Sequence, residues 1–288
     1  MESFKRWLVR QGKSKITIDV YVRSVMQMQA WWQSVRGVLF EPIKVEAQDL
    51  EDWLNYMQID ASYLPSKHEK PRSYSLATIK SSLAGVRSYF QFLVINKILD
   101  CSPAAELKLD MTTYPKPSGG WLEPEEKNRL LQWIASEIAH ARKERRRQLI
   151  RNKAIIYSAL YGGLTAGEVV RCTITDISFN PPIIQIGDRA VLMGKVLCSS
   201  MKDWVHLRAA DLEAPLFSSQ MGRLTEDGIT NFLKNYARET GLQNLTMQSL
   251  RHTYARDLAL QGKSTIEIAE SLGLHAENAR RYRFGLRR

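Results

Sequence analysis

The chain has 288 residues, of which 44% are hydrophobic and 25% charged, a composition typical of a folded globular protein long enough for two domains. No apolar stretch approaches the roughly 18 residues that span a bilayer and the N-terminus lacks the apolar core of a secretory signal, so membrane and secreted proteins are excluded and we expect a cytoplasmic, nucleoid-associated protein. Because 41 Lys and Arg face 30 Asp and Glu, the net charge of +11 favours a polyanionic partner, most commonly nucleic acid, over a merely soluble basic protein.

The first hundred residues show apolar positions at helical spacing. Residues 3–34 carry them with a break at Gly12 to Ser14, which predicts two helices. Two further helices are predicted over 45–58 and 75–98, the second with Ser75 as its cap. Residues 61–74 between them are polar and contain prolines, which is typical of an exposed loop.

A domain boundary is predicted at residues 108–121, where prolines, glycines and small polar residues occur without apolar periodicity. We therefore expect a helical domain over 1–107, a linker, and a second domain over 122–288. In the second domain a Glu-rich helix start follows the linker, and the basic run 141–147 is expected at a helix C-terminus, where the helix dipole favours it. That run is read as a solvated helix end, with phosphate contact as the alternative.

Short strands are predicted next, over 183–186 and 190–193, joined by the turn Gly187 to Arg189. From residue 225 onward the pattern is helical again, over 225–241, 249–262, 265–273 and 277–284. The predicted fold class is therefore mainly α, with a helical N-terminal domain and an α-rich second domain that contains a small β-hairpin or sheet.

The three cysteines, Cys101, Cys172 and Cys198, are odd in number and widely spaced. Neither a disulfide framework nor a thiolate metal site is indicated. They are interpreted as small core residues.

Three separated blocks of sequence resemble the tyrosine recombinase (phage integrase) family and occur in that family's order. The first covers residues 4–32 and 73–104, the second is RNKAIIYSALYGGLTAGEVVRCTITDI (151–177), and the third is LRHTYARDLALQGKSTIEIAESLG (250–273), followed by Tyr282. The resemblance covers essentially the whole chain. It implies a helical DNA core-binding domain before the linker and a catalytic domain after it. An ordinary amphipathic helix would explain the third block but not the other two.

The resemblance implies a transesterification in which a tyrosine hydroxyl attacks a DNA phosphodiester and forms a 3′-phosphotyrosyl link. Negative charge grows on the nonbridging phosphate oxygens, and guanidinium groups match those oxygens geometrically. No metal and no cofactor is implied. On this resemblance Tyr282 is the nucleophile, Arg251 the second catalytic arginine and His252 the histidine beside it. We expect Arg251 and Tyr282 to converge on one phosphate, with simple aromatic packing of Tyr282 as the alternative.

The first catalytic arginine of the family falls on Thr165, which is neutral. Arg171, six positions further on, lies about 240° around a helix and is expected to face elsewhere. By this comparison the chain lacks one guanidinium of the family's set.

Other positions also depart from the family pattern. The hairpin turn offers Arg189 where a lysine is usual; a guanidinium supplies charge but is a poor proton donor. Lys195 is predicted to lie past the second strand. Gln248 and Leu274 stand where basic or aromatic residues are usual, and His275 follows one residue late. The expected catalytic set is Tyr282, Arg251, His252, His275 and Arg189, with Thr165, Gln248 and Leu274 as degenerate positions.

Two hypotheses of different classes follow. In the first, the chain is a divergent recombinase that cuts and rejoins DNA of a mobile element through Tyr282, with Arg189, His252, His275 or a partner protomer supplying the missing charge. In the second, it is a catalytically impaired DNA-binding protein with an accessory or regulatory role, because losing one contact to the transition state costs about 10² to 10³ in rate. A helical RNA- or protein-binding factor is a third, minor reading.

The expected partner is double-stranded DNA, held between the two domains and bound through phosphate contacts. A homo-tetramer on DNA and a partner recombinase are further expectations that the resemblance implies. The residues expected to contact DNA are basic and lie on or next to predicted helices: Lys13, Lys15, Lys80, Arg87, Arg280, Arg281 and Arg283. Each is also consistent with ordinary surface charge.

Overall fold

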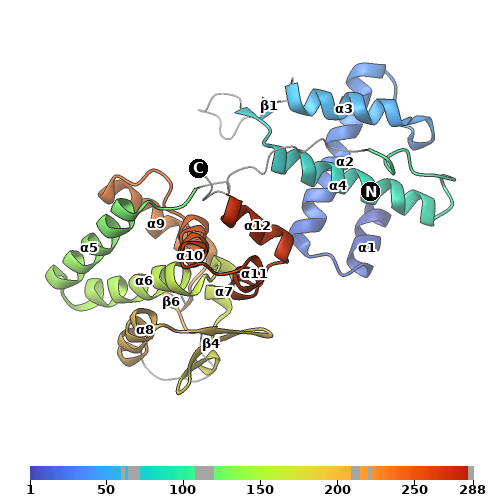
Figure 1. Cartoon of the computed structure of the whole chain (residues 1–288). Helices are drawn as coiled ribbons and strands as arrows, with labels where there is room; N and C mark the ends of the chain where they lie inside the picture. The colour runs from blue at the N-terminus through green and yellow to red at the C-terminus, as the bar shows by residue number, and fades with distance from the viewer. Residues whose placement is uncertain (60–61, 64–71, 108–119, 209–214, 220–221, 285–288) are drawn as a thin grey trace. The chain divides into compact units, whose positions relative to one another are not determined.

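The computed structural model describes residues 1–59, 62–63, 72–107, 120–208, 215–219 and 222–284. The chain divides into two compact units, Met1–Thr112 and Thr113–Arg288, and both are mainly helical (Figure 1). All but the last two residues of the expected linker, 108–121, lie outside the described residues. Within the described residues, no helix is both long and apolar enough to cross a membrane.

The N-terminal unit is built from helices, with one short strand pair. Its elements are α1 (Glu2–Arg10), α2 (Lys15–Arg36), the 3-10 helix η1 (Pro42–Lys44), α3 (Ala47–Ile59), β1 (Ser62–Tyr63), β2 (Arg72–Ser73) and α4 (Leu76–Ile95). The segment predicted as a plain loop, 61–74, therefore contains two antiparallel strands at its ends, and residues 64–71 lie outside the description.

Local side chains define the two long helices of this unit. The hydroxyl of Ser14 accepts a hydrogen bond from Thr17 N at 3.2 Å and begins α2, and Ser75 accepts from Thr78 N at 3.1 Å and begins α4. The two helices pack against each other. Their buried faces join α1 in a core rich in aromatic rings, where Phe4 meets Tyr89 edge-on at 5.3 Å.

The C-terminal unit contains the remaining described helices and two small antiparallel sheets, one of three strands and one of two. Its elements are α5 (Pro124–His140), α6 (Lys143–Gly162), α7 (Ala166–Arg171), η2 (Ile174–Asp176), β3 (Ile177–Phe179), β4 (Pro182–Ile186), β5 (Arg189–Leu192), α8 (Lys195–Leu207), β6 (Ser218–Ser219), β7 (Gly222–Arg223), α9 (Glu226–Thr240), α10 (Met247–Leu260), α11 (Thr265–Leu272) and α12 (Ala276–Phe284). The predicted fold class, mainly α with a small sheet, is confirmed.

The predicted hairpin is part of a three-stranded antiparallel sheet in the order β3, β4, β5. Ile184 pairs with Val191 across β4 and β5, and both side chains are buried. The additional strand, β3, pairs Ile177 with Ile184. Arg189 is the first residue of β5 and not a turn residue, because the turn is only two residues long.

The expectation for the basic run 141–147 was wrong. This run lies at the N-terminus of α6, because α5 ends at His140 and a new helix begins at Lys143. The helix dipole disfavours cations there by only about 0.3–1 kcal/mol. The buried face of α6, which includes Leu149, Ile155 and Ile156, outweighs that cost.

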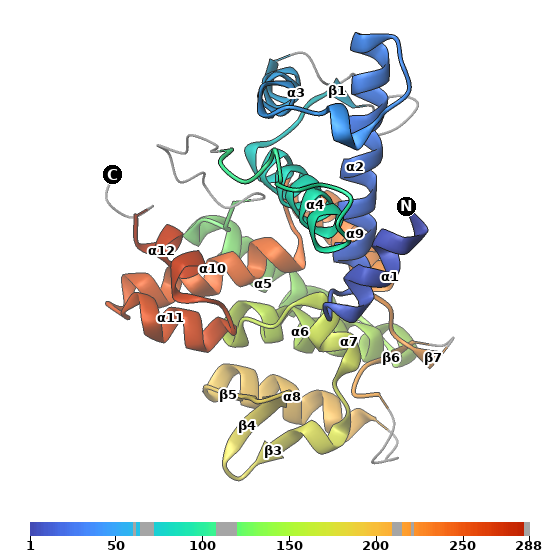
Figure 2. The same ribbon diagram turned by 90° about the vertical axis from the view of Figure 1, so that its right-hand side faces the viewer.

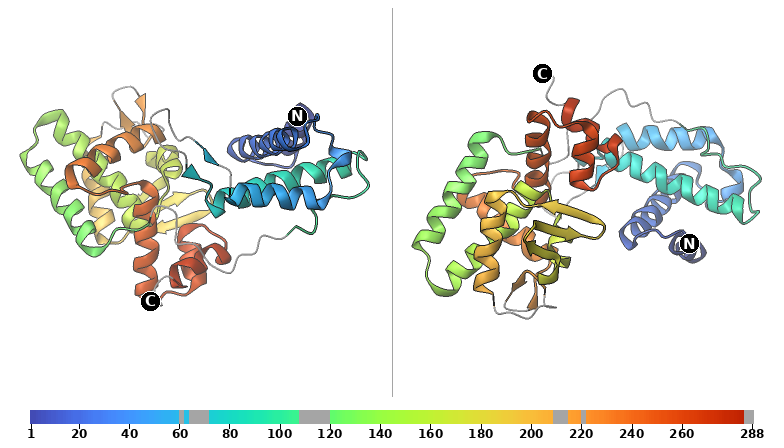
Figure 3. Two further views of the ribbon diagram at one scale, coloured as in Figure 1. Left: turned by 90° about the horizontal axis from the view of Figure 1, so that it is seen from above. Right: turned by 60° about the horizontal axis from the view of Figure 1, so that its bottom comes forward.

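Helix α6 is the centre of the C-terminal unit and packs against α8 on one side and α10 on the other. Figure 2 shows the three-stranded sheet beside α8, away from the group formed by α10, α11 and α12. Figure 3 shows α11 and α12 side by side from two further directions. A separate small core joins these helices, and the ring of Tyr282 is part of it.

Candidate phosphate-handling site

The end of α6 positions the first part of the site. Gly163 adopts a left-handed conformation (φ 66°) that ends the helix and turns the chain toward α7. A Cβ at this position would lie 2.7 Å from the ring of Tyr254 and 2.8 Å from Leu272. A glycine is therefore required both by the backbone angle and by the space.

Thr165 begins α7 as its N-cap, and Glu168 completes a reciprocal capping box with it. The Glu168 carboxylate Oε2 accepts from Thr165 N at 2.7 Å and from Thr165 Oγ1 at 3.0 Å, while Glu168 N donates to Thr165 Oγ1 at 3.2 Å. These bonds fix the carboxylate at the helix N-terminus. Thr165 itself carries no charge but determines where a negative charge lies.

Arg251 on α10 is one of the most buried charged residues described, with 5% of its surface exposed. Its guanidinium donates to the carbonyl of Gly163, to the carbonyl of Leu272 at 2.6 Å, and to Glu168 Oε2 at 3.4 Å. Burial lowers the pKa of Arg251, and the Glu168 carboxylate acts in the opposite direction. Arg251 is therefore held rigidly by backbone oxygens and one carboxylate.

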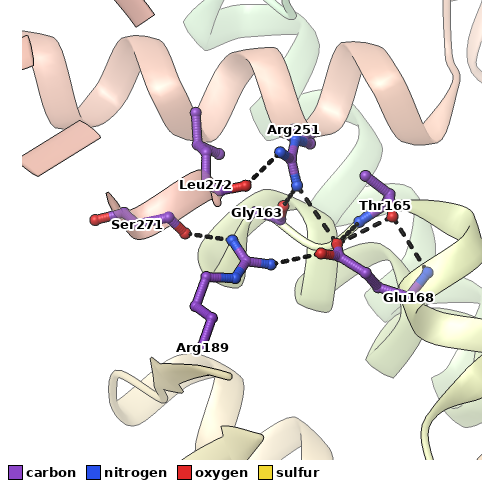
Figure 4. Close-up of polar contacts among 7 residues, drawn as sticks. All are labelled: Gly163, Thr165, Glu168, Arg189, Arg251, Ser271 and Leu272. Carbon is purple, nitrogen blue, oxygen red and sulfur yellow. Dashed lines mark hydrogen bonds and ion pairs between the residues drawn. The ribbon is translucent and has the colours of Figure 1, made fainter. Parts of the chain in front are cut away.

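Arg189 reaches the same carboxylate from the sheet. Its Nη2 donates to Glu168 Oε1 at 2.8 Å, and its Nη1 donates to the carbonyl of Ser271 at 2.7 Å. Figure 4 shows Arg189 and Arg251 approaching Glu168 from different elements, each also bound to a carbonyl at the end of α11. The two guanidinium groups thus share one carboxylate, and each also bonds one of two successive carbonyl groups.

Tyr282 lies on α12 with 1% of its surface exposed. Its Oη is 2.7 Å from Nδ1 of His252 and accepts from Nη2 of Arg281 at 3.1 Å. The Arg281 guanidinium also lies over the Tyr282 ring, 5.0 Å from its centre. Among the described residues no hydrogen bond joins Tyr282 to Arg251. Tyr282 instead bonds His252, the residue that follows Arg251 on α10.

The protonation of His252 follows from its two contacts. With the Gln248 amide oriented as in this structure, its Nε2 donates to Nε2 of His252 at 3.0 Å, which places the ring proton on Nδ1, toward Tyr282 Oη. Burial, together with the charges of Arg281 and Arg251, lowers the pKa of His252 to about 4. The ring is therefore neutral at pH 7, and in this arrangement it donates to the phenol oxygen.

The other residues expected at the catalytic site lie apart from these contacts. The side chain of His275 is exposed just before α12, and Leu274 packs against the small apolar core of α10, α11 and α12. Arg171 is exposed on α7. Lys195 is the first residue of α8 and is exposed. The structure groups Arg189 with Arg251, and His252 with Tyr282; among the described residues no hydrogen bond or ion pair joins the His275 side chain to either pair.

The residues expected to contact DNA are mostly exposed. Lys13, Lys15, Lys80, Arg87 and Arg280 are exposed. Arg87 also donates to the carbonyl of Leu107, and the half-buried Arg281 donates to Tyr282 Oη. The side chain of Arg283 lies outside the description. Sequence reasoning missed Glu168 and the carbonyls of Gly163, Ser271 and Leu272; only Glu168 left a signal, in the Thr-x-x-Glu capping pattern.

These contacts define a class of protein: a two-unit helical protein that gathers two guanidinium groups, an imidazole and a phenol in its second unit, the groups that phosphoryl transfer to a tyrosine uses. The model of the Phage integrase family matches residues 121–283, more than half of the chain, and the chain belongs to that family.

Individual relatives agree with this assignment. The chain is 28% identical to the tyrosine recombinase XerD of Oceanobacillus iheyensis over 222 residues, which cover 72% of this chain and 70% of that protein. It is 23% identical to the tyrosine recombinase XerA of Pyrococcus furiosus over 283 residues, 95% of this chain and 84% of the relative.

Solved structures share the fold. XerH recombinase bound to palindromic difH substrate superposes with a TM-score of 0.71 at 18% identity, covering 94% of this chain and 77% of that one. The Tn1549 transposon integrase in complex with circular intermediate DNA gives a TM-score of 0.70 at 16% identity, covering 97% and 94%.

Proposed function

We propose that the chain is a site-specific DNA recombinase of a mobile element, which breaks and rejoins DNA strands through Tyr282. The observation that carries the proposal is the 2.7 Å contact between Tyr282 Oη and His252, whose neighbour on α10 is Arg251. A phenol, an imidazole and a guanidinium at this spacing suit attack on a phosphodiester. Family membership supports the same reaction.

The reaction conserves the number of phosphoester bonds. Tyr282 Oη loses its proton, attacks the phosphorus and forms a P–O bond, while the bond from phosphorus to the 5′-oxygen breaks and that oxygen takes up a proton. A 5′-hydroxyl of another strand later attacks the 3′-phosphotyrosyl link and releases Tyr282. Arg251 contributes charge to the nonbridging oxygens, where negative charge accumulates.

Two features of the resting arrangement bear on this reaction. The ring of Tyr282 is buried, and its oxygen receives bonds from His252 and Arg281. A phosphate in solvent does not reach Oη in that position, so α12 must shift before attack. Because His252 donates to Oη in this state, it is suited to donate to a phosphate oxygen or to the leaving 5′-oxygen once Tyr282 has moved.

Double-stranded DNA is the proposed substrate. The net charge of +11 and the exposed Lys13, Lys15, Lys80 and Arg280 support electrostatic binding along the phosphate backbone. Two structures with the same fold are complexes with DNA: XerH with difH substrate and the Tn1549 integrase with circular intermediate DNA. A tetramer on two DNA sites, formed from this chain alone or with a partner recombinase, belongs to the same proposal.

A second function is favoured by one observation. Thr165 is neutral at the place where the family resemblance expects the first catalytic arginine, and its hydroxyl is committed to capping α7. In this alternative the chain binds DNA as an accessory or regulatory protein and does not break it. The two functions differ in one measurable product, a covalent complex with DNA.

The test is covalent capture on nicked duplexes. A pool of about 30-bp duplexes, long enough to contact both units at 3.4 Å per base pair, carries a randomised centre and a nick that prevents religation. Denaturing electrophoresis then separates the covalent protein–DNA species. We expect such a species from the wild-type protein and from the Tyr157→Phe control, a half-buried tyrosine of α6, and none from Tyr282→Phe.

Either of two results contradicts the recombinase proposal. One is a covalent species that persists in Tyr282→Phe. The other is the absence of any covalent species while the wild-type protein still binds the duplexes, which establishes the accessory function.

A further inference from the structure

The unusual feature of the site is that Glu168 serves two arginines that come from distant parts of the chain. Arg189 bonds one carboxylate oxygen and Arg251 the other, at 2.8 and 3.4 Å. The same two groups bond the adjacent carbonyls of Ser271 and Leu272. The guanidinium groups are therefore held next to each other, side by side, by oxygens at both ends (Figure 4).

Thr165 and Arg189 converge on this carboxylate. The Thr165 hydroxyl bonds Glu168 Oε2 at 3.0 Å, and the Arg189 guanidinium bonds Oε1 of the same group. The two positions are far apart in sequence, on α7 and on β5, yet their polar groups lie around one carboxylate. The Arg189 guanidinium, which comes from the sheet, therefore bonds the same carboxylate as the side chain of residue 165.

The charges of the cluster do not cancel. Two guanidinium cations face one carboxylate, and the side chains of Arg189, Arg251 and Glu168 are only 15%, 6% and 17% exposed. Burial lowers the pKa of Arg251, and the Glu168 carboxylate opposes that lowering. One excess positive charge in a weakly solvated position favours a singly charged anion, and a phosphodiester carries one such charge.

Donors remain for such an anion. A guanidinium has five N–H groups. The contacts within the described residues use two on Arg189, to Glu168 and Ser271, and three on Arg251, to Gly163, Leu272 and Glu168. Both groups therefore keep N–H donors for a ligand, as a pair of guanidinium groups on one phosphate requires.

We propose that Arg189 takes the place of the missing arginine at position 165 and binds a nonbridging oxygen of the scissile phosphate together with Arg251. This inference rests on the proposed function, because the phosphate is the one that Tyr282 attacks. Glu168, fixed by the capping box with Thr165, is the positioning residue that directs Arg189. Arg189 supplies charge and not the proton of the leaving oxygen, because a guanidinium is too weak an acid for that step.

The sharpest test removes the arginine at position 189 and introduces one at position 165. The variants are Arg189→Ala, the double variant Thr165→Arg with Arg189→Ala, and the control Arg171→Ala, which removes an exposed arginine of α7. The measurement is the single-turnover rate of covalent complex formation on the nicked duplexes. We expect Arg189→Ala to be slower by about 10² to 10³, the usual cost of losing one charge contact to a transition state. Arg171→Ala should match the wild-type protein, and the double variant should recover at least about one factor of ten of the loss.

A structural brace predicts a different pattern. Arg189→Ala lowers the melting temperature in either case, because the bonds to Glu168 and Ser271 are lost. If Arg189 only ties β5 to α11, an arginine at position 165 does not restore the rate. That result overturns the inference, as does a wild-type rate in Arg189→Ala. Neither result affects the proposed function, which the comparison of the wild-type protein with Tyr282→Phe decides.

A second readout needs no cleavage. In the Tyr282→Phe protein the affinity for the same duplexes is measured against salt concentration, and each phosphate contact contributes about 0.9 to the slope of log K against log salt. We expect Arg189→Ala to reduce the slope by about 0.9 and Arg171→Ala to leave it unchanged. An unchanged slope in Arg189→Ala overturns the phosphate contact, whether or not the protein cleaves DNA.

Discussion

Replacing Glu168 by glutamine removes the charge that holds the two arginines and keeps the shape of the side chain. The carboxylate accepts charge-assisted bonds from Arg189 at 2.8 Å and Arg251 at 3.4 Å, and such bonds contribute about 1.5–3 kcal/mol each, the longer one least. It also accepts from Thr165 N at 2.7 Å, a capping bond worth about 1 kcal/mol. The glutamine keeps one acceptor oxygen and points an amide donor at a cation. We therefore expect the free energy of unfolding to fall by about 3 kcal/mol, the lower end of the cost of breaking a buried ion pair.

Thermal and urea unfolding, followed by circular dichroism, measure this loss. For a unit of this size about 3 kcal/mol corresponds to a drop of about 6–12 °C in Tm. The matched control is Glu270→Gln, the same change at an exposed position of α11, which should stay within about 0.5 kcal/mol of the wild-type protein. A double-mutant cycle of Glu168→Gln with Arg189→Gln isolates the pair and should give a coupling of about 1 kcal/mol or more. The reasoning is refuted if Glu168→Gln and Glu270→Gln are equally stable, or if the two changes in the cycle add independently.

Three further predictions follow from burial and backbone geometry. Because the pKa of His252 is lowered to about 4, the unfolded chain takes up a proton on this residue at a higher pH than the folded chain does. The contribution of His252 to the free energy of unfolding is therefore fully present above pH 6.5 and falls by about 3 kcal/mol toward pH 4. In urea unfolding of His252→Asn this part of the decline should be missing. Gly163→Ala should lower the free energy of unfolding by about 2–5 kcal/mol, the sum of left-handed strain and overpacking. The control, Gly187→Ala, is also at positive φ but has open space around it. It should lose only about 1–2 kcal/mol in the same measurement. Burial raises the pKa of the Cys172 thiol to about 12, so mass spectrometry after brief iodoacetamide treatment at pH 8 should find Cys101 labelled and Cys172 unlabelled until the protein is denatured.

Most helices could be predicted from the sequence because their signals are local. Ser14 and Ser75 cap α2 and α4, and the apolar positions between the caps recur at helical spacing. The break between α5 and α6 could not be predicted from charge, since a dipole preference below about 1 kcal/mol yields to the burial of a whole helix face. Helix α8 was not among the helices predicted from the sequence. Its buried residues Leu197, Met201 and Trp204 nevertheless stand at helical spacing.

The residues of the site divide in the same way. The capping box of Thr165 and Glu168 is local and readable as a Thr-x-x-Glu pattern. The bond between Glu168 and Arg189 joins α7 to β5, residues that are 21 positions apart in the sequence. The bonds of Arg251 end on backbone carbonyls, which every residue has, so no side-chain pattern predicts them. Which groups share a carboxylate is therefore a property of the packed unit.

The end of α11 links this cluster to Tyr282, the proposed nucleophile. Gly273 ends α11 in a left-handed conformation, and a Cβ there would lie 3.4–3.5 Å from the Arg189 side chain. The carbonyls just before it, of Ser271 and Leu272, hold Arg189 and Arg251. Helix α12, which carries Tyr282, begins only at residue 276. A movement of α12 that frees Tyr282 must therefore pivot after Leu272, because a pivot any earlier would pull away the carbonyls that keep the two arginines in place for the phosphate.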